Sequence, residues 1–372
     1  MVIQFINGII KLRATGTEDF AFQSWANKFS EKKRLAFKAG IAQSLLRCLT
    51  SIFPIVASMF IFSHIVYRIS DKVFSIGDFA AYYSAYGQFQ NSLLQMAFYL
   101  TSSLYIFPLY RRLKPIITQI PEVDETKAKP KEINGNISII NINFKYEADG
   151  PMVLHDLSLE IENGKFIALV GKSGCGKSTL IRLLLGFETP ISGAILYDQQ
   201  DLFSVDIREI RKQIGVVLQN SQIMQGNIME NIIGSSNLTI SEAWQAAEMA
   251  GIAKDIKEMP MGMHTVLTSG GGTLSGGQRQ RLLIARAVAK KPRLIIFDEA
   301  TSALDNQTQK IVSESLEKLN ATRVVVAHRL STVKNADKIC FLDNGSIVEK
   351  GTFNELMAKK GLFAELARRQ LI

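Results

Sequence analysis

The chain has 372 residues, 47% of them hydrophobic and 21% charged, so it is long enough for two domains and apolar enough both to build a core and to enter lipid. The formal net charge is +9, and most of the excess lies in residues 1–132, which hold 16 Lys and Arg against nine Asp and Glu. The basic residues flank apolar runs, which favours the cytoplasmic flanks of membrane helices and counts against nucleic-acid binding. The three cysteines show neither metal-ligand spacing nor a paired framework, which excludes a disulfide scaffold.

Two charge-free runs in the first third of the chain predict membrane-spanning helices. Residues 48–67 contain no Asp, Glu, Lys or Arg, and this is about the length that a helix needs to cross the hydrocarbon core. Residues 79–110 are also charge-free but contain four amide side chains, which suit a helix facing a protein-lined cavity better than one facing lipid. We therefore predict transmembrane helices over about residues 43–67 and 79–108, with a pair of buried soluble helices as the alternative.

The charges around these runs predict their orientation. Lys and Arg residues precede the first run at positions 28–38, and "RRLK" follows the second at 111–114. The loop 68–78 between the runs has two positive and two negative residues. By the positive-inside rule both outer ends lie in the cytoplasm and the short loop lies outside. The opening "MVIQFINGII" is too short for a cleavable signal sequence.

A linker and then an α/β domain are predicted for the rest of the chain. Residues 121–136, "PEVDETKAKPKEINGN", are rich in charge, Pro, Gly and Asn, which is typical of a linker. Beyond them "ISIININFKY" alternates as a strand does, and "KFIALVG" and "RLIIFDE" are short buried strands separated by helical stretches. This alternation predicts an α/β domain with a largely parallel sheet over residues 137–370.

A phosphate-binding loop is predicted at "GKSGCGKST", residues 171–179. The segment follows the strand "KFIALV" and opens a helix, which is the context that the motif G-x-x-x-x-G-K-[ST] requires. Backbone N–H groups and the helix dipole can bind the α- and β-phosphates, Lys177 should reach the β- and γ-phosphate oxygens, and the Ser178 hydroxyl should ligate Mg²⁺. The predicted nucleotide-binding residues are Gly171, Lys172, Ser173, Gly174, Cys175, Gly176, Lys177, Ser178 and Thr179.

Four further polar side chains follow buried strands and complete the predicted catalytic site. Asp298 ends a strand and can hold the magnesium shell, while Glu299 is placed to orient a water molecule against the γ-phosphate. His328 follows "TRVVVA" and is assigned as a γ-phosphate sensor, with a structural histidine as the alternative. Gln219 follows "IGVVL" and can contact both the metal and the attacking water.

The order of these motifs resembles the ATP-binding cassette (ABC) family over about residues 137–370. The resemblance depends on the aromatic Tyr146, the phosphate loop, Gln219, "LSGGQ" at residues 274–278, "IIFDEATSALD" at residues 295–305, and His328. It implies that Tyr146 stacks on adenine and that residues 302–305 meet a partner subunit. It also implies that Ser275, Gly276, Gly277 and Gln278 contact the γ-phosphate bound to a second cassette. ATP, Mg²⁺, ATP hydrolysis and a dimer of cassettes are the resulting expectations.

The two apolar runs resemble the last two transmembrane helices of a type I ABC exporter half, with residues 11–40 as a cytoplasmic helix extension. The expected fold is therefore an α-helical membrane segment in contact with lipid, followed by an α/β P-loop NTPase of the ABC type with a helical subdomain. The resemblance implies a multi-pass protein of the inner or plasma membrane with its cassette in the cytoplasm. Three segments, "GMHTVLTSGGGTLSGGQRQRLLIARA", "FDEATSALDNQTQ" and "GLFAELARRQ", resemble NHLM-type bacteriocin export ATPases, which implies a peptide cargo.

Two departures from the family pattern leave alternatives open. An exporter half has six membrane helices and this chain has room for about two, so we expect either a split subunit whose remaining helices lie on another chain or a non-transporting remnant. Ser269 stands where exporters usually have Glu, which weakens the expected coupling to the membrane domain. An exporter of lipid or drug-like cargo is a further alternative. So is a soluble ABC ATPase acting on nucleic acid, against which the apolar runs argue.

Overall fold

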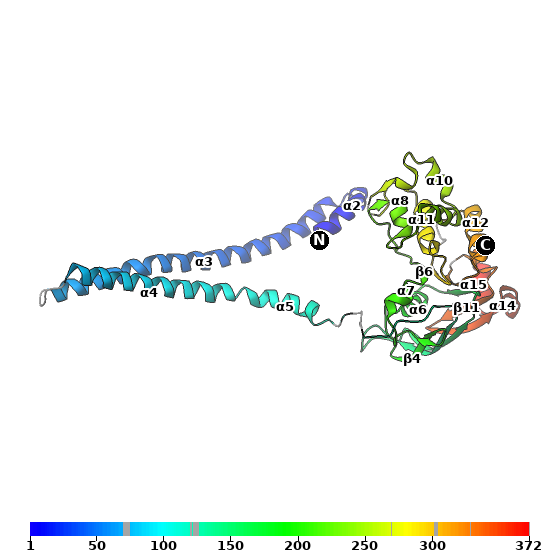
Figure 1. Cartoon of the computed structure of the whole chain (residues 1–372), viewed down its shortest axis with the longest axis horizontal. Coiled ribbons are helices and arrows are strands. Elements are labelled where there is room, and N and C mark those ends of the chain that lie inside the picture. The colour runs from blue at the N-terminus through cyan, green and yellow to red at the C-terminus, as the bar shows by residue number, and fades with distance from the viewer. Residues whose placement is uncertain are drawn as a thin grey trace. The chain divides into compact units, whose positions relative to one another are not determined.

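The computed structural model describes residues 1–69, 75–119, 121, 126–268, 270–300, 304–327 and 329–371. The chain divides into two compact units, Met1–Ile120 and Pro121–Ile372. The first unit is helical and the second is an α/β domain (Figure 1). The predicted order, a helical segment followed by an α/β domain, is confirmed.

The helical unit is built from five described helices. They are α1 (Val2–Asn7), α2 (Ile9–Thr15), α3 (Glu18–Ile69), α4 (Ile76–Ser103) and α5 (Ile106–Ile117). Ser75 caps α4 by accepting hydrogen bonds from the N–H groups of Gly77 at 3.0 Å and Asp78 at 3.3 Å. The ring of Phe62 on α3 lies 5.5 Å from that of Phe79 on α4, so these two helices pack together near their connection.

The structure departs from the prediction for the second apolar run. The predicted helix over residues 79–108 is divided, because α4 ends at Ser103 and α5 begins at Ile106. Pro108 has no N–H group to donate to the carbonyl of Leu104, and its ring opposes a continuous helix at that carbonyl. The break therefore lies where an intact helix would lose a backbone hydrogen bond.

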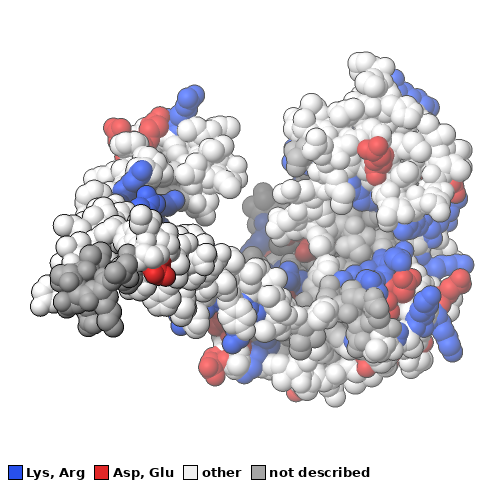
Figure 2. Space-filling view, turned by 60° about the vertical axis from the view of Figure 1, so that its left-hand side comes forward, with Lys and Arg blue, Asp and Glu red and all other residues white. Residues whose placement is uncertain are grey.

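Two helical stretches of this unit are long and apolar enough to cross a membrane by length and composition. They are Glu18–Tyr67, with a mean hydropathy of 2.0 in its most apolar window, and Ile76–Ile117, with 1.2. Their apolar windows are not buried within the protein. The visible surface of the helical unit is largely uncharged (Figure 2). Large apolar surfaces that face outward in this way are typical of contact with lipid or with further protein.

The α/β domain contains two main sheets and a small ribbon. The antiparallel sheet has the order β2-β1-β4-β5, with β1 (Ile137–Phe144), β2 (Leu154–Ile161), β4 (Ser192–Tyr197) and β5 (Gln200–Asp201). The larger sheet has the order β12-β11-β3-β10-β9-β6, with β3 (Phe166–Gly171), β6 (Ile214–Val217), β9 (Leu294–Asp298), β10 (Thr322–Val326), β11 (Lys338–Asp343) and β12 (Ser346–Gly351). All of its pairings are parallel except the one between β11 and β12. The ribbon pairs β7 (Gly226–Asn227) with β8 (Val266–Leu267).

Helices connect and cover these strands. They are α6 (Lys177–Leu184), α7 (Ile207–Arg211), α8 (Ile228–Ile233), α9 (Ile240–Met249), α10 (Ala253–Glu258), the 3₁₀ turn η1 (Gly262–His264), α11 (Gly276–Val288), α12 (Asn306–Lys318), α13 (Leu330–Val333), α14 (Phe353–Lys359) and α15 (Leu362–Leu371). α8, α9 and α11 pack on one another, and this group forms the helical subdomain together with α10.

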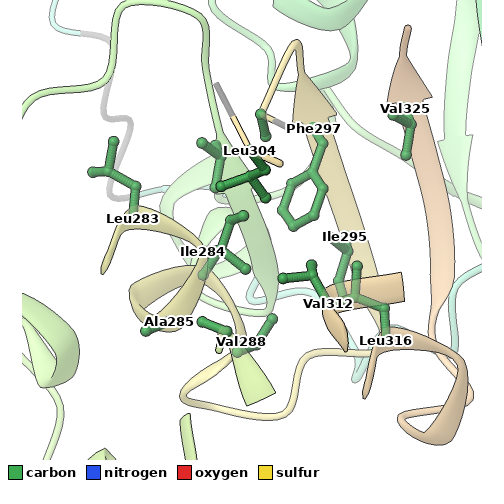
Figure 3. Packing of buried hydrophobic residues seen from close by; sticks show 14 of the residues in the cluster. Leu283, Ile284, Ala285, Val288, Ile295, Phe297, Leu304, Val312, Leu316 and Val325 are labelled. Atoms are coloured by element: carbon green, nitrogen blue, oxygen red, sulfur yellow. The ribbon is translucent and has the colours of Figure 1, made fainter. Parts of the chain in front are cut away.

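The core lies on both faces of the larger sheet. Ile295 and Phe297 of β9 belong to a cluster with α11 and α12, whereas Ile296 of the same strand belongs to a second cluster with α6 and the antiparallel sheet. Figure 3 shows Ile284 of α11 and Val312 of α12 beside Phe297 in the first cluster. A strand that is buried on both faces needs a continuous apolar run, and each such side chain contributes about 1.5–3 kcal/mol on burial. The four apolar residues "LIIF" within "RLIIFDE" form such a run in β9.

The described part of the predicted linker is fixed to the domain. The carboxylate of Asp198, in the β4–β5 turn, accepts hydrogen bonds from the N–H groups of Asn134 at 2.5 Å, Gly135 at 3.2 Å and Asn136 at 3.1 Å. The N–H of Ile133 donates to Oε1 of Gln213 at 2.8 Å, and the Ile133 side chain is buried. The chain therefore enters the domain along a defined path over residues 133–136.

Candidate functional site

The predicted phosphate-loop and catalytic residues follow four neighbouring parallel strands, β3, β10, β9 and β6. In register, Leu169 of β3 pairs with Val326 of β10, which pairs with Asp298 of β9. The carboxyl ends of these strands therefore meet at one edge of the sheet, where α/β proteins bind their ligands. The phosphate loop, Glu299 and the Gln219 segment all follow strands that end at this edge. Gln219 is exposed and lies two residues beyond β6.

The backbone of the phosphate loop adopts conformations that favour glycine. Gly174 has φ +82° and Gly176 has φ +104°, both in the left-handed region. A Cβ atom at Gly176 would also lie 2.7 Å from the side chain of Leu154. The glycine conformations lead the loop directly into the N-terminus of α6. The N–H groups of the loop and the dipole of α6 can therefore act on the same bound phosphate.

Lys177 lies inside the loop, and only 5% of the residue is exposed. Its Nζ donates to the carbonyl oxygens of Gly171 and Lys172, both at 2.8 Å, and to Sγ of Cys175 at 3.7 Å. The ammonium group is thus held against the loop that is expected to surround the phosphates. Ser178, the next residue, is exposed at the start of α6. This arrangement suits the binding of a phosphate by a charge-assisted hydrogen bond.

The two acidic residues at the end of β9 have different environments. Asp298 is the last residue of the strand and is 5% exposed, while Glu299 is half-buried. Glu299 has φ +56°, a left-handed conformation that costs a non-glycine residue about 1–2 kcal/mol. Its N–H donates to the carbonyl of Val326 at 3.2 Å, and its carbonyl accepts from Nε2 of Gln280 at 3.0 Å. No sequence motif had indicated Gln280.

Tyr146 lies just beyond β1 and is 54% exposed. Its ring packs edge-on against Phe144 with centroids 4.9 Å apart, and its hydroxyl forms a hydrogen bond with Oγ1 of Thr179 at 3.1 Å. This contact places an exposed aromatic ring beside the first turn of α6. The position is compatible with the adenine-stacking role that the family resemblance implies for Tyr146.

The signature residues lie at the start of α11. Ser275 caps the helix in a capping box with Gln278, whose N–H donates to Oγ of Ser275 at 3.2 Å. Nε2 of Gln278 also donates to Asp255 of α10 at 2.8 Å. Ser275 and Gly276 are exposed, so the helix presents its N-terminus, a hydroxyl group and free backbone N–H groups to the outside of the chain.

Magnesium fits the donor set at the carboxyl edge. Over the described part of the chain no group of three or more His, Cys, Asp or Glu side chains gathers as a metal site. Mg²⁺ usually needs only one or two carboxylates, with water and substrate phosphates filling the remaining positions. Asp298, the Ser178 hydroxyl and the Gln219 amide would offer oxygen ligands of this kind, so their chemistry fits an ion that binds together with a nucleotide.

The motifs and their placement correspond to one family. Residues 154–302 match the family model described as "ABC transporter". The domain is an ABC transporter ATP-binding domain. The predicted family resemblance is thereby confirmed.

Relatives of the whole chain are ABC export proteins. The chain is 34% identical over 378 residues to the leukotoxin export ATP-binding protein LtxB of Aggregatibacter actinomycetemcomitans, covering 100% of this chain and 53% of that protein. It is 39% identical over 319 residues to the alpha-hemolysin translocation ATP-binding protein HlyB of Escherichia coli O157:H7, covering 85% and 45%. This chain therefore spans about half the length of the curated relatives it matches.

A solved structure also matches the whole of this chain. It is described as a bacterial Atm1-family ABC exporter with ATP bound, and it aligns with a TM-score of 0.88 at 29% sequence identity. The match covers 100% of this chain and 66% of that one. The ABC exporter fold thus extends over both the helical unit and the cassette.

Several predicted site positions of the ABC cassette lie outside the described residues. These are His328, Ser269, and residues 302 and 303 of the segment expected to meet a partner. Of that segment, Leu304 is buried and Asp305 caps α12 by accepting from the N–H of Thr308 at 3.1 Å. Hydrogen bonds from Thr308, first from its side-chain hydroxyl and then from its N–H, hold the pKa of the Asp305 carboxyl below its ordinary value.

Proposed function

We propose that this chain is the ATP-binding and ATP-hydrolysing part of an ABC exporter. The observation that supports this most is the division of the site: the chain holds a complete phosphate loop and strand-end acid, yet turns its signature residues outward. ATP bound between two such cassettes would hold them face to face, and hydrolysis would release them. In this scheme residues 1–120 are part of a transmembrane domain, residues 121–136 are a linker and residues 137–370 are the nucleotide-binding domain.

Each site residue has a proposed task. Lys177 and the loop from Gly171 to Thr179 bind the phosphates, and Tyr146 stacks on the adenine ring. Ser178, Asp298 and Gln219 would hold Mg²⁺, which would supply positive charge against the phosphates. Glu299 orients the attacking water and accepts its proton, because its carboxylate follows β9 at the same sheet edge as the phosphate loop. His328 is proposed as the γ-phosphate sensor.

A second cassette is the proposed partner. Ser275, Gly276, Gly277 and Gln278 would supply a hydroxyl group, N–H groups and a helix dipole to the γ-phosphate held by that partner. The partner is a second copy of this chain or a related subunit. The exposure of Ser275 and Gly276 supports this role.

Mixed dimers of this chain test whether the signature acts on the partner's site. Pairing a Glu299→Gln chain with a Ser275→Ala chain should leave one intact site and about half of the wild-type ATPase rate. Pairing a chain that carries both changes with a wild-type chain damages both sites, and we expect at least a tenfold loss of ATPase activity. Phosphate release from tag-purified mixed dimers measures both rates. The reverse order of activities would contradict a signature that acts on the partner.

We further propose that the helical unit resides in the inner or plasma membrane with the cassette in the cytoplasm. The support is the pair of apolar helices, with their unburied apolar windows and basic flanks. The remaining transmembrane helices of the exporter and lipid would cover these surfaces.

Alkaline carbonate extraction of membranes tests this location. We expect the chain to stay in the membrane pellet, because residues 48–67 can span the hydrocarbon core. A peripheral membrane protein released in the same wash serves as the control. Release of this chain into the supernatant would favour a soluble ABC ATPase and contradict the proposal.

The proposed cargo is a peptide or protein. The curated relatives are named for export or translocation of leukotoxin and alpha-hemolysin, and the C-terminal motifs resemble bacteriocin export ATPases. Within this class we propose a ribosomally made peptide of the bacteriocin type.

A further inference from the structure

We propose that Gln280, on the signature helix α11, positions Glu299 of its own cassette for catalysis. The inference rests on the proposed function, since it assumes that Glu299 orients and deprotonates the attacking water. Gln280 would not touch nucleotide or water itself. It would act through the backbone of Glu299, so it is a positioning residue and not a catalytic one.

Two hydrogen bonds fix the backbone on either side of the Glu299 side chain. The N–H of Glu299 donates to the carbonyl of Val326 on β10 at 3.2 Å. The carbonyl of Glu299 accepts from Nε2 of Gln280 at 3.0 Å. Between these bonds Glu299 has φ +56°, and a non-glycine residue keeps such a conformation only when its surroundings hold it. The direction of the carboxylate therefore depends on both β10 and α11.

The opposite face of α11 is held by another part of the cassette. Nε2 of Gln278 donates to Asp255 of α10 at 2.8 Å, and Arg281 pairs with the same carboxylate at 2.9 Å. Gln280 lies about 200° around the helix from Gln278, so it faces away from Asp255. α11 thus links the helical subdomain on one face to the end of β9 on the other.

This link connects two sites in the proposed dimer. The N-terminus of α11 would contact the partner's nucleotide through Ser275, while Gln280, five residues later on the same rigid helix, holds the acid of the chain's own site. A small shift of α11 on binding would turn the peptide that joins Glu299 to Ala300. Ala300 is 2% exposed, so it cannot absorb this turn freely. Occupancy of one site would then set the geometry of the other.

Packing of α11 does not depend on the Gln280 amide. Leu282, Ile284 and Val288 are each at most 1% exposed and anchor the helix on the core (Figure 3 shows Ile284 and Val288). A change at Gln280 should therefore alter the position of Glu299 while the cassette still folds.

The test replaces Gln280 by Glu in the full chain, which keeps the size of the side chain but puts an acceptor opposite the Glu299 carbonyl. At pH 8 we expect kcat for ATP hydrolysis to fall at least tenfold, with KM for ATP within twofold of wild type. Repulsion between the two oxygens raises the pKa of the introduced carboxyl, so lowering the pH should protonate it and restore a donor. The ratio of variant to wild-type kcat should then rise as pH falls towards 5.5.

The matched control is Gln245→Glu, the same change on the exposed surface of α9. Its kcat relative to wild type should stay near one at every pH. A Gln280→Glu variant with wild-type kcat overturns the inference, as does a loss of kcat that does not recover at low pH or appears only as a raised KM.

Glu299→Gln, measured in parallel, separates this inference from the proposed function. If Glu299→Gln retains hydrolysis, the proposed role of Glu299 fails and Gln280 has no acid to position. If Glu299→Gln is inactive while Gln280→Glu behaves as wild type, the proposed function stands and only the Gln280 inference is overturned.

Discussion

Replacing Glu299 by Gln is expected to reduce ATP hydrolysis at least 100-fold while ATP affinity stays within about threefold of wild type. A general base accelerates a reaction by about 10²- to 10⁴-fold, and a glutamine side chain cannot accept the proton of the attacking water. Nucleotide binding should persist because Lys177 and Asp298 remain in place. Phosphate release at saturating ATP measures the first effect, and titration with a fluorescent ATP analogue measures the second.

The matched control for this prediction is Glu314→Gln. Glu314 is an exposed residue of α12, and its Oε1 lies 3.9 Å from Nζ of Lys310. Removing its charge should leave the hydrolysis rate within twofold of wild type. Hydrolysis that survives in Glu299→Gln would exclude Glu299 as the catalytic base.

Replacing Lys177 by Ala is expected to weaken ATP binding itself by about 10- to 100-fold. Hydrogen bonds to charged groups are worth about 1.5–3 kcal/mol, and this change removes the ammonium that the loop holds for the phosphates. The carbonyls of Gly171 and Lys172 also lose their donor, so the empty loop should become less rigid. Equilibrium titration with ATP measures the affinity, and thermal unfolding without nucleotide checks that the domain is folded.

Lys165→Ala is the control for the loss of positive charge. Lys165 precedes β3, its side chain is 48% exposed, and it lies 3.6 Å from Asp337. ATP affinity should be unchanged in this variant. An affinity for ATP that is unchanged in Lys177→Ala would contradict the phosphate-loop assignment.

The phosphate loop and the strand-end acid could be predicted because their geometry is local. A buried apolar run such as "KFIALV" or "RLIIFD" specifies a strand in this context, and the residues that follow it must emerge at the carboxyl edge of a parallel sheet. Gly174 and Gly176 have the left-handed φ values that the motif anticipates. Local sequence is therefore enough to predict that these residues lie together at one edge of the sheet.

One feature of the site depends on a contact between distant segments, and no sequence motif predicts it. Gln280 meets Glu299 only because α11 packs beside β9, and nothing in "RQRLL" distinguishes it from an exposed helical glutamine. The apolar pattern alone predicts a helix over residues 43–67, and the family resemblance predicts its cytoplasmic extension over residues 11–40. Most of that extension belongs to α3, which runs from Glu18 to Ile69 as one helix. Its polar half contains no Pro and only one Gly, so helix propensity extends the apolar part where hydropathy gives no signal.

The length of α3 has a mechanical consequence. At about 1.5 Å per residue its 52 residues extend about 78 Å, more than twice the hydrocarbon thickness of about 30 Å. If residues 48–67 lie in lipid, the thirty residues before them project about 45 Å from the membrane as one rod. A rod of this kind works as a lever arm, so a tilt of a few degrees within the bilayer becomes a displacement of several ångströms at Glu18. Pro54 lies in the apolar part of the helix. Because proline removes a backbone hydrogen bond, the helix would bend most easily there.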